Sequence, residues 1–209
     1  FDVWMRRHFP QCPFERYADD AVVHCRSQAE AQAVVKAIRD RFEQCHLELH
    51  PTKTRIVYCK SDDRPEQHEH VTFDFLGYTF RPRRAKSRRG KYFLGFLPAI
   101  SNKAAKAIRQ TIRDWRMASQ RSNQRLEDLA RLVNPSVRGW IHYYGRYYRY
   151  ACVRALCPLN EALTSWVQRK FTRYRHRQRA STHWLGRVAQ RDPSLFVHWQ
   201  FGARPAAGV

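Results

Sequence analysis

Four consecutive residues near the start of the chain, Tyr17-Ala18-Asp19-Asp20, carry the side chains best suited to chemistry. The two adjacent carboxylates repel each other unless solvent or a cation takes up their charge. Hard oxygen ligands of this kind suit Mg²⁺, which binds through one or two carboxylates together with substrate phosphates. An Asp-Asp pair by itself is also typical of a solvated turn. The tetrapeptide therefore indicates either a metal site or an ordinary turn, and its surroundings decide between them.

The segments around the acidic pair predict a hairpin and a helix. Short β-type runs at residues 14–17 and 21–25 flank the pair, which places Asp19 and Asp20 at a hairpin tip. Ser27 and Glu30 then give a Ser-x-x-Glu capping signature, and apolar residues follow at helical spacing. We therefore expect a helix over about 28–45. Residues 1–9 resemble the end of an amphipathic helix that Pro10 stops.

The rest of the chain changes from β-type to helical spacing near residue 99. Further β-type runs stand at 56–58, 71–80 and 92–97. From Ser101 onward the apolar spacing is helical, with faces over 105–115 and 126–133 and further helices expected over 159–174 and 182–190. The fold class is therefore α+β, with a mixed block over 1–98 and an all-α block over 99–209.

The charge is divided as sharply as the secondary structure. Up to Asp74 there are 11 Lys and Arg against 13 Asp and Glu, whereas from Phe75 onward there are 28 against 5. The formal net charge of +21 therefore belongs to the second part. Such self-repulsion is costly unless a polyanion offsets it, and nucleic acid is the first candidate. A membrane surface is disfavoured because no apolar run approaches 18 residues.

The six cysteines stand at irregular spacing without a Cys-x-x-Cys pair. We interpret them as reduced, mostly buried thiols of a cytoplasmic protein rather than a zinc site or disulfide framework. His68 and His70 follow a polar stretch that is more typical of a solvated loop than of a metal site. No signal peptide is visible, and a first residue other than Met suggests that the chain begins inside something longer.

Four motifs in a fixed order give the chain a family resemblance. The acidic hairpin, Phe14-Glu15-Arg16-Tyr17-Ala18-Asp19-Asp20, resembles the palm-domain catalytic hairpin of group II intron-encoded reverse transcriptases. Residues 47–54, with sequence LELHPTKT, and residues 73–80, with sequence FDFLGYTF, resemble the next two palm motifs of that family. Residues 134–144, with sequence NPSVRGWIHYY, resemble the maturase-specific X region, which forms the thumb. Any one motif is weak, but together they are strong.

The resemblance implies a partial reverse-transcriptase palm followed by an all-α thumb, and it assigns roles by position. Asp19 is implied as the main Mg²⁺ ligand and Asp20 as its less direct partner. Lys53 is implied to neutralise triphosphate charge or protonate pyrophosphate, although a plain exposed lysine is the alternative. Tyr17 and Ala18 are expected near the primer end and incoming dNTP. Residues of the 73–80 motif are expected to hold the primer, namely Leu76, Gly77 and Tyr78.

One expected ligand has no counterpart in the chain. Polymerases of this family take a second essential aspartate from a strand well upstream of the hairpin, and they carry a fingers segment. The only acids before Asp19 are Asp2 and Glu15, and neither stands in a matching motif. We therefore expect a two-metal site that an aspartate outside this chain completes, an upstream half of the polymerase as a partner, and little or no polymerase activity from this chain alone.

Basic residues of the second part are the candidates for binding intron RNA, the RNA template and the DNA primer. Seven positive charges lie within eleven residues between two β-type runs, and we expect them to form a mobile loop that orders on a phosphate backbone. In residues 139–150 aromatics alternate with Arg, and a helix over this stretch would gather Trp140, Tyr143, Tyr144, Tyr147 and Tyr148 on one face, more often core than stacking platform. The predicted contacts are Arg81, Arg83, Arg84, Lys86, Arg88, Arg89, Lys91, Arg138, Arg146, Arg149, Arg169, Lys170 and Arg173.

The expected function is that of a C-terminal part of an RNA-directed DNA polymerase that also binds intron RNA to assist splicing and mobility. It would act in the cytoplasm of a bacterial-type cell, associated with the nucleoid when bound to DNA. Two alternatives remain open at this point. One is a truncated RNA-binding maturase remnant without polymerase activity, and the other is a related reverse transcriptase that ignores intron RNA. A purely structural basic protein would not explain the ordered motifs.

Overall fold

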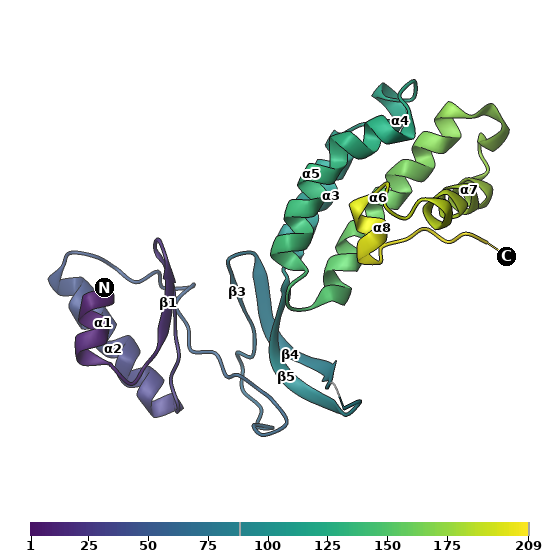
Figure 1. Cartoon of the computed structure of the whole chain (residues 1–209). Helices are drawn as coiled ribbons and strands as arrows, with labels where there is room; N and C mark the ends of the chain where they lie inside the picture. Colours follow the sequence, from purple (N-terminus) through teal and green to yellow (C-terminus); the bar gives the residue numbers. More distant parts are fainter. Residues whose placement is uncertain (88, 209) are drawn as a thin grey trace. The chain divides into compact units, whose positions relative to one another are not determined.

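A computed structural model describes residues 1–87 and 89–208, and the chain divides into two compact units, Phe1–Thr72 and Phe73–Val209. Figure 1 shows the first unit in purple and blue and the second from teal to yellow. The mixture of small antiparallel sheets and helices confirms the α+β class. The division between a palm block at 1–98 and a thumb at 99–209 stays a prediction.

Unit 1 contains two helices and a β-hairpin. Helix α1 (Asp2–His8) leads into strands β1 (Phe14–Tyr17) and β2 (Asp20–Val23), which pair antiparallel, and helix α2 (Gln28–Gln44) follows. The predicted cap is present, because the Ser27 hydroxyl accepts a hydrogen bond from the Glu30 N–H at 3.1 Å. Met5, Cys12, Val34 and Ile38 are its buried core.

The expected strand at 56–58 is wrong, because this stretch has no strand in the described structure. A backbone hydrogen bond links this stretch to a later part of unit 1, since the Tyr58 N–H donates to the His70 carbonyl at 2.8 Å. Tyr58 also stacks on His68, with 4.1 Å between ring centroids. An apolar β-branched run has strand propensity, but without a neighbour to continue the pairing it forms no ladder.

Unit 2 begins with a three-stranded antiparallel sheet in the order β3-β4-β5, made of β3 (Phe73–Phe75), β4 (Tyr78–Lys86) and β5 (Tyr92–Ile100). The expectation of a mobile basic loop is corrected here, because Arg81, Arg83, Arg84 and Lys86 belong to β4. Pairing with the largely apolar β5, from Tyr78↔Ile100 to Lys86↔Tyr92, holds them in a strand. Among the described residues, Arg89 and Lys91 lie between the two strands.

The helices of unit 2 bury one large core. They are α3 (Asn102–Asp114), α4 (Met117–Gln120), α5 (Leu126–Tyr144), α6 (Arg149–Lys170), the 3-10 turn η1 (Thr172–Tyr174), α7 (Gln178–Arg191) and α8 (Val197–Phe201). Leu156, Leu159 and Trp166 of α6 are almost completely buried, as is Trp199 of α8. Figure 1 shows α6 running beside α5, α7 and α8, so it is the central helix.

Two helical expectations require correction. The helix expected over 159–174 begins ten residues earlier, at Arg149, and continues through Pro158, although proline is normally disfavoured inside a helix. The aromatic stretch over 139–150 is not one helix, because α5 ends at Tyr144 with Gly145 as its C-cap. A Cβ at Gly145 would lie 2.5 Å from the Ile141 carbonyl oxygen and 2.7 Å from the Phe201 ring, so the turn needs glycine.

The β3–β4 turn docks on the end of α5. Leu76 and Gly77 both have positive φ, 49° and 78°, as a tight two-residue hairpin requires. The Tyr143 hydroxyl donates to the Leu76 carbonyl at 2.9 Å, and the Tyr78 hydroxyl donates back to the Tyr143 carbonyl. The Ser101 N–H donates to the Gly77 carbonyl at 2.9 Å. These bonds fasten the sheet to the helices.

This docking makes two glycines behave oppositely on substitution. Gly77→Ala places a Cβ at positive φ and 2.9 Å from the Tyr144 hydroxyl oxygen, so we expect unit 2 to lose about 1–2 kcal/mol. Gly139→Ala, in the interior of α5 with open space around it, should gain about 0.5–1 kcal/mol. Urea unfolding followed by tryptophan fluorescence measures both changes. Equal effects of the two substitutions would contradict the structure.

Acid should destabilise unit 2 through His198. This side chain is fully buried, its Nε2 lies 2.9 Å from the Asn160 Oδ1, and burial lowers its pKa to about 3. The ordinary pKa of histidine is 6.5. Between about pH 3 and pH 6.5, His198 is therefore protonated in the unfolded chain but neutral in the folded chain. The free energy of unfolding should therefore fall as the pH drops from about 6.5 toward 3, by up to about 3 kcal/mol between pH 7 and 4.

Denaturant unfolding from pH 7 to pH 4 measures this loss, with His198→Gln as the matched neutral variant. The variant should be less stable than the parent at pH 7 but lose less stability on acidification. Parallel curves for the two proteins would show that His198 is not the titrating group.

Candidate active site and nucleic-acid interface

The Asp19–Asp20 pair lies at the tip of the β1–β2 hairpin of unit 1. Both side chains are exposed, and Tyr17 pairs with Asp20 across the two-residue turn formed by Ala18 and Asp19. Ala18 has a φ of 53°, a left-handed conformation that costs a non-glycine residue energy. The structure thus places two adjacent hard oxygen donors in water on a constrained turn, which is an arrangement that fits Mg²⁺.

Arg16 positions this turn, and sequence reasoning missed it. Its Nη1 donates to the Ala18 carbonyl at 2.7 Å, while its Nε and Nη2 donate to the two carboxylate oxygens of Asp2 at 2.6 and 3.1 Å. The hydrogen bond from Arg16 lowers the pKa of Asp2, and the same bond raises the pKa of Arg16. A basic residue beside an acidic motif was the available signal, but its partner on α1 could not be read from spacing.

The bidentate ion pair with Arg16 occupies both carboxylate oxygens of Asp2. Of the two acids before Asp19, Asp2 is committed to Arg16, and Glu15 stands exposed on β1. Among the described residues, no group of three metal-ligating side chains includes Asp19 or Asp20. The two carboxylates therefore supply only part of a ligand set from the residues that the structure describes.

Lys53 lies in a turn at residues 51–53, between α2 and β3, and is exposed. The preceding residues hold this turn, because the Thr54 N–H donates to the His50 carbonyl at 3.0 Å. Within the described part of the chain, no ion pair joins Lys53 to either aspartate. The structure thus makes the ammonium group available to solvent but gives it no direct link to the acidic turn.

Leu76, Gly77 and Tyr78 form the β3–β4 turn of unit 2, where their side chains have unequal access. Leu76 is 38% exposed, whereas Tyr78 is 8% exposed and lies among the rings of Tyr143, Tyr144 and Tyr147. Burial, with help from these neighbouring tyrosines, raises the pKa of Tyr78 to about 12, so its hydroxyl stays protonated and donates. The Tyr78 side chain thus holds the turn in place.

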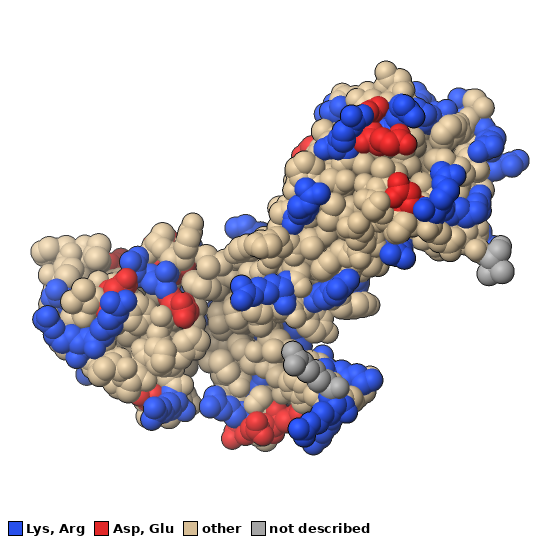
Figure 2. Space-filling model, in the orientation of Figure 1, with Lys and Arg blue, Asp and Glu red and all other residues tan. Residues whose placement is uncertain are grey.

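The basic surface of unit 2 contains both exposed and internally bonded residues. The charge balance from Phe73 onward is 28 Lys and Arg against 6 Asp and Glu. Figure 2 shows Lys and Arg spread over the helices and gathered at the far end of the β4–β5 hairpin. The exposed members of the predicted set are Arg81, Arg84, Lys86, Arg89, Lys91, Arg138, Arg146, Arg149, Arg169 and Arg173. Arg88 lies outside the described residues.

Three predicted contacts are held by the fold itself. Arg83 is half-buried, donates to the Leu97 and Thr79 carbonyls at 3.2 and 3.3 Å, and has its pKa lowered by burial. The Lys170 ammonium reaches the carbonyls of residues 122, 123 and 124, the last at 2.5 Å. Arg149 donates to the Phe201 carbonyl, and its guanidinium lies over the Phe201 ring. Position in the sequence could not identify these three, of which Arg149 is also exposed.

The cysteines depart from expectation in burial. All six are free thiols, but only Cys12 and Cys152 are buried, while Cys45 and Cys157 are exposed. The expectation of mostly buried thiols is therefore wrong. Apolar character alone does not place a thiol inside, since neighbouring residues decide what covers it. No described helix combines the length and apolar character that crossing a bilayer requires.

Comparison with known families assigns both parts of the chain. Residues 2–80 match the family of reverse transcriptases (RNA-dependent DNA polymerases), and residues 105–184 match the group II intron maturase-specific domain. No curated protein and no solved structure gave a significant match. The first match contains the acidic hairpin and reaches the β3–β4 turn, and the second contains α5, α6 and most of α3. The chain therefore belongs to the group II intron reverse transcriptases/maturases, and it carries both a reverse-transcriptase part and the maturase-specific domain.

Proposed function

We propose that Asp19 and Asp20 bind the Mg²⁺ with which a reverse transcriptase of this family extends a DNA primer on RNA. The observation that carries this is the exposed carboxylate pair on a turn that Arg16 holds through the Ala18 carbonyl. Restraint of this kind matters because a metal site needs its ligands fixed before substrate arrives. When bound, Mg²⁺ offsets phosphate charge and stabilises the entering 3′-oxygen and the leaving pyrophosphate.

The chain's own residues take the remaining roles. Asp19 is the principal ligand and Asp20 the less direct one, while Lys53 neutralises triphosphate charge and is available to protonate pyrophosphate. Tyr17, 64% exposed beside the turn, and Ala18 contact the primer end and the dNTP. In unit 2, Leu76 and the backbone of Gly77 face the primer, whereas Tyr78 acts by positioning that turn.

We further propose that the ligand set is completed by substrate phosphates and by an aspartate that this chain does not carry. Support comes from the commitment of Asp2 to Arg16 and from the absence of a third ligand near Asp19 among the described residues. A complete two-metal site would need carboxylates on both sides of the ions. On this account the chain alone binds RNA but does not polymerise.

Primer extension tests this incompleteness directly. The chain alone, with annealed RNA template, DNA primer, dNTPs and Mg²⁺, should incorporate no nucleotide, because its carboxylates are only part of the site. An Asp19→Ala variant is the control and should behave identically while keeping its RNA binding. Incorporation by the parent that the Asp19→Ala change abolishes would mean that a complete metal site exists in this chain.

The second activity we propose is binding of intron RNA by the exposed basic residues of unit 2. The charge balance of 28 against 6 supports it, together with the match to a maturase-specific domain. Because each phosphate contact releases counterions, this binding should weaken linearly in log affinity against log salt. The aspartates of unit 1 take no part in it, so intron RNA binding is separable from polymerisation.

Two lysine substitutions give a matched test. Lys86→Ala removes an exposed charge from β4, and Lys36→Ala removes an exposed charge from α2 in unit 1. Lys86→Ala should reduce the slope of log affinity against log salt by about 1 and weaken binding uniformly across RNA sequences. Lys36→Ala should leave the slope unchanged. Filter binding of intron RNA over a salt series measures the slope for each variant. Equal slopes for the two variants would show that Lys86 of β4 does not contact the RNA.

A further inference from the structure

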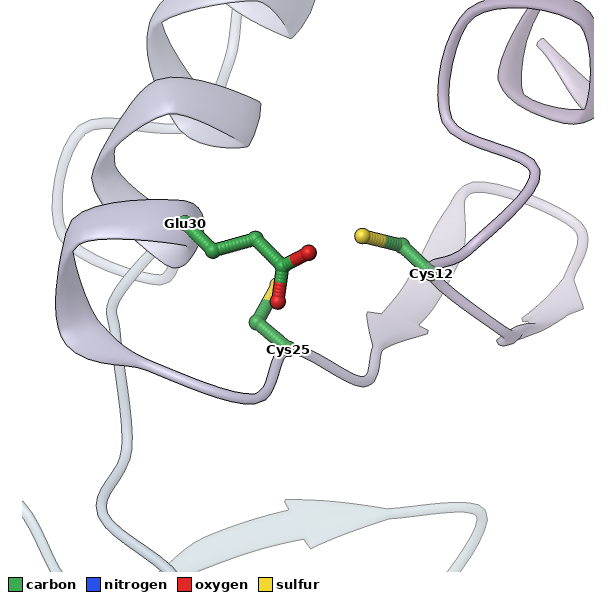
Figure 3. Close-up of side chains that lie close together, drawn as sticks. All are labelled: Cys12, Cys25 and Glu30. Atoms are coloured by element: carbon green, nitrogen blue, oxygen red, sulfur yellow. The ribbon is translucent and has the colours of Figure 1, made fainter.

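A second group of ligand side chains lies at the opposite end of the hairpin from Asp19 and Asp20. The Cys12 and Cys25 sulfurs and a Glu30 carboxylate oxygen all lie within 4.8 Å of one another, and they are the one such group of three among the described residues. Figure 3 shows the Glu30 carboxylate reaching from α2 toward both sulfurs. The proposed polymerase site does not use these residues.

The hairpin register explains why the two thiols meet. Phe14 pairs with Val23, and the His24 N–H donates to the Pro13 carbonyl at 2.8 Å, which continues the ladder by one pair. Cys12 and Cys25 are the next pair outward. After a hydrogen-bonded pair the next antiparallel pair is a non-hydrogen-bonded one, where facing side chains come closest. Their approach is therefore built into the pairing of β1 with β2.

Glu30 is fixed over the thiols by the start of α2. Its N–H donates to the Ser27 hydroxyl, and its Oε2 accepts from the Arg26 N–H at 2.6 Å. The Arg26 bond is the main cause that lowers the pKa of Glu30, and the Cys12 thiol contributes in the same direction. The Glu30 carboxylate is therefore ionised, and the Arg26 N–H holds it in place, where it can bind a further partner.

Two thiols and a carboxylate are a donor set for a thiophilic divalent cation. Zn²⁺ accepts sulfur at about 2.3 Å and carboxylate oxygen at about 2.0–2.2 Å, so its ligand atoms lie roughly 3.5–3.8 Å apart. Because the observed atoms lie within 4.8 Å of one another, the group would close by shifts of at most about 1 Å. Mg²⁺ prefers oxygen ligands alone, so the two sites would not compete for the same ion.

We propose that Cys12, Cys25 and Glu30 bind one Zn²⁺-like cation that fastens the base of the catalytic hairpin. Binding replaces two thiol protons, which pass to solvent, and leaves the fourth coordination position to water or another ligand. The ion joins three segments of unit 1, which are the α1–β1 connection, the β2–α2 connection and the first turn of α2. Unit 1 has only four buried core residues, and small cores gain most from such a link.

Binding of Co²⁺ to the reduced, tag-free full chain tests the proposal, because thiolate ligands give cobalt a charge-transfer absorption that oxygen ligands lack. We expect one Co²⁺ per chain with this band, displacement by Zn²⁺ but not by Mg²⁺, and tighter binding as the pH rises. Cys12→Ser and Glu30→Gln should each weaken binding more than tenfold. Cys45→Ser and Cys157→Ser, which alter exposed thiols, should leave it unchanged.

Three outcomes would overturn the proposal. One is the lack of a thiolate band at stoichiometric Co²⁺. Another is a band that persists in both Cys12→Ser and Glu30→Gln, with circular dichroism showing that the variants fold. The third is a count of four free thiols instead of six in protein purified without reductant. Reduction would have to restore the two missing thiols, and Cys12→Ser would have to prevent their loss. That last result would assign the pair to disulfide formation by a cellular oxidant such as a peroxide.

Discussion

The docking of the β3–β4 turn onto the end of α5 is the constraint on which the architecture of unit 2 depends. Leu76 adopts a left-handed conformation that costs energy in a residue other than glycine, whereas Gly77 adopts one at little cost, and the Tyr143 hydroxyl at the end of α5 holds the turn. The Tyr78 hydroxyl, with its pKa raised to about 12, donates back to the same helix. A turn that is expected to hold the primer is thereby fixed by the maturase-specific helices.

The two units use charge in opposite ways. Unit 1 presents carboxylates on a restrained turn, where an internal Arg16–Asp2 pair holds the backbone and leaves Asp19 and Asp20 in water. Unit 2 presents an excess of Lys and Arg with few acids between them, and its stability comes from a large apolar core around α6. The repulsion within such a basic surface favours binding of a polyanion, which would offset it. Under the proposed function, nucleotide addition and RNA binding would use different residues of the chain.

Local signals predicted the acidic hairpin and α2 well, because their determinants lie within a few residues. The Ser27–Glu30 cap is an example, since both partners are three residues apart. The same reasoning failed where a distant partner decided the outcome. Arg81–Lys86 became a strand because β5 pairs with it, and 56–58 did not because no strand does. Pro158 stands inside α6, whose neighbours bury both halves of the helix.

The roles of individual residues were also missed where a partner distant in the sequence decides them. Composition predicted a basic surface, but it could not separate exposed Arg84 from Arg83, which donates to two carbonyls within its own sheet. The Cys12–Cys25 approach also depends on hairpin register, which irregular cysteine spacing conceals.

If unit 2 binds intron RNA as proposed, that binding does not need the acidic turn. The decisive measurement is the affinity for intron RNA of a double variant, Asp19→Asn with Asp20→Asn. We expect unchanged or slightly tighter binding, because two negative charges are removed. A loss of affinity of tenfold or more would show that the acidic turn takes part in RNA binding.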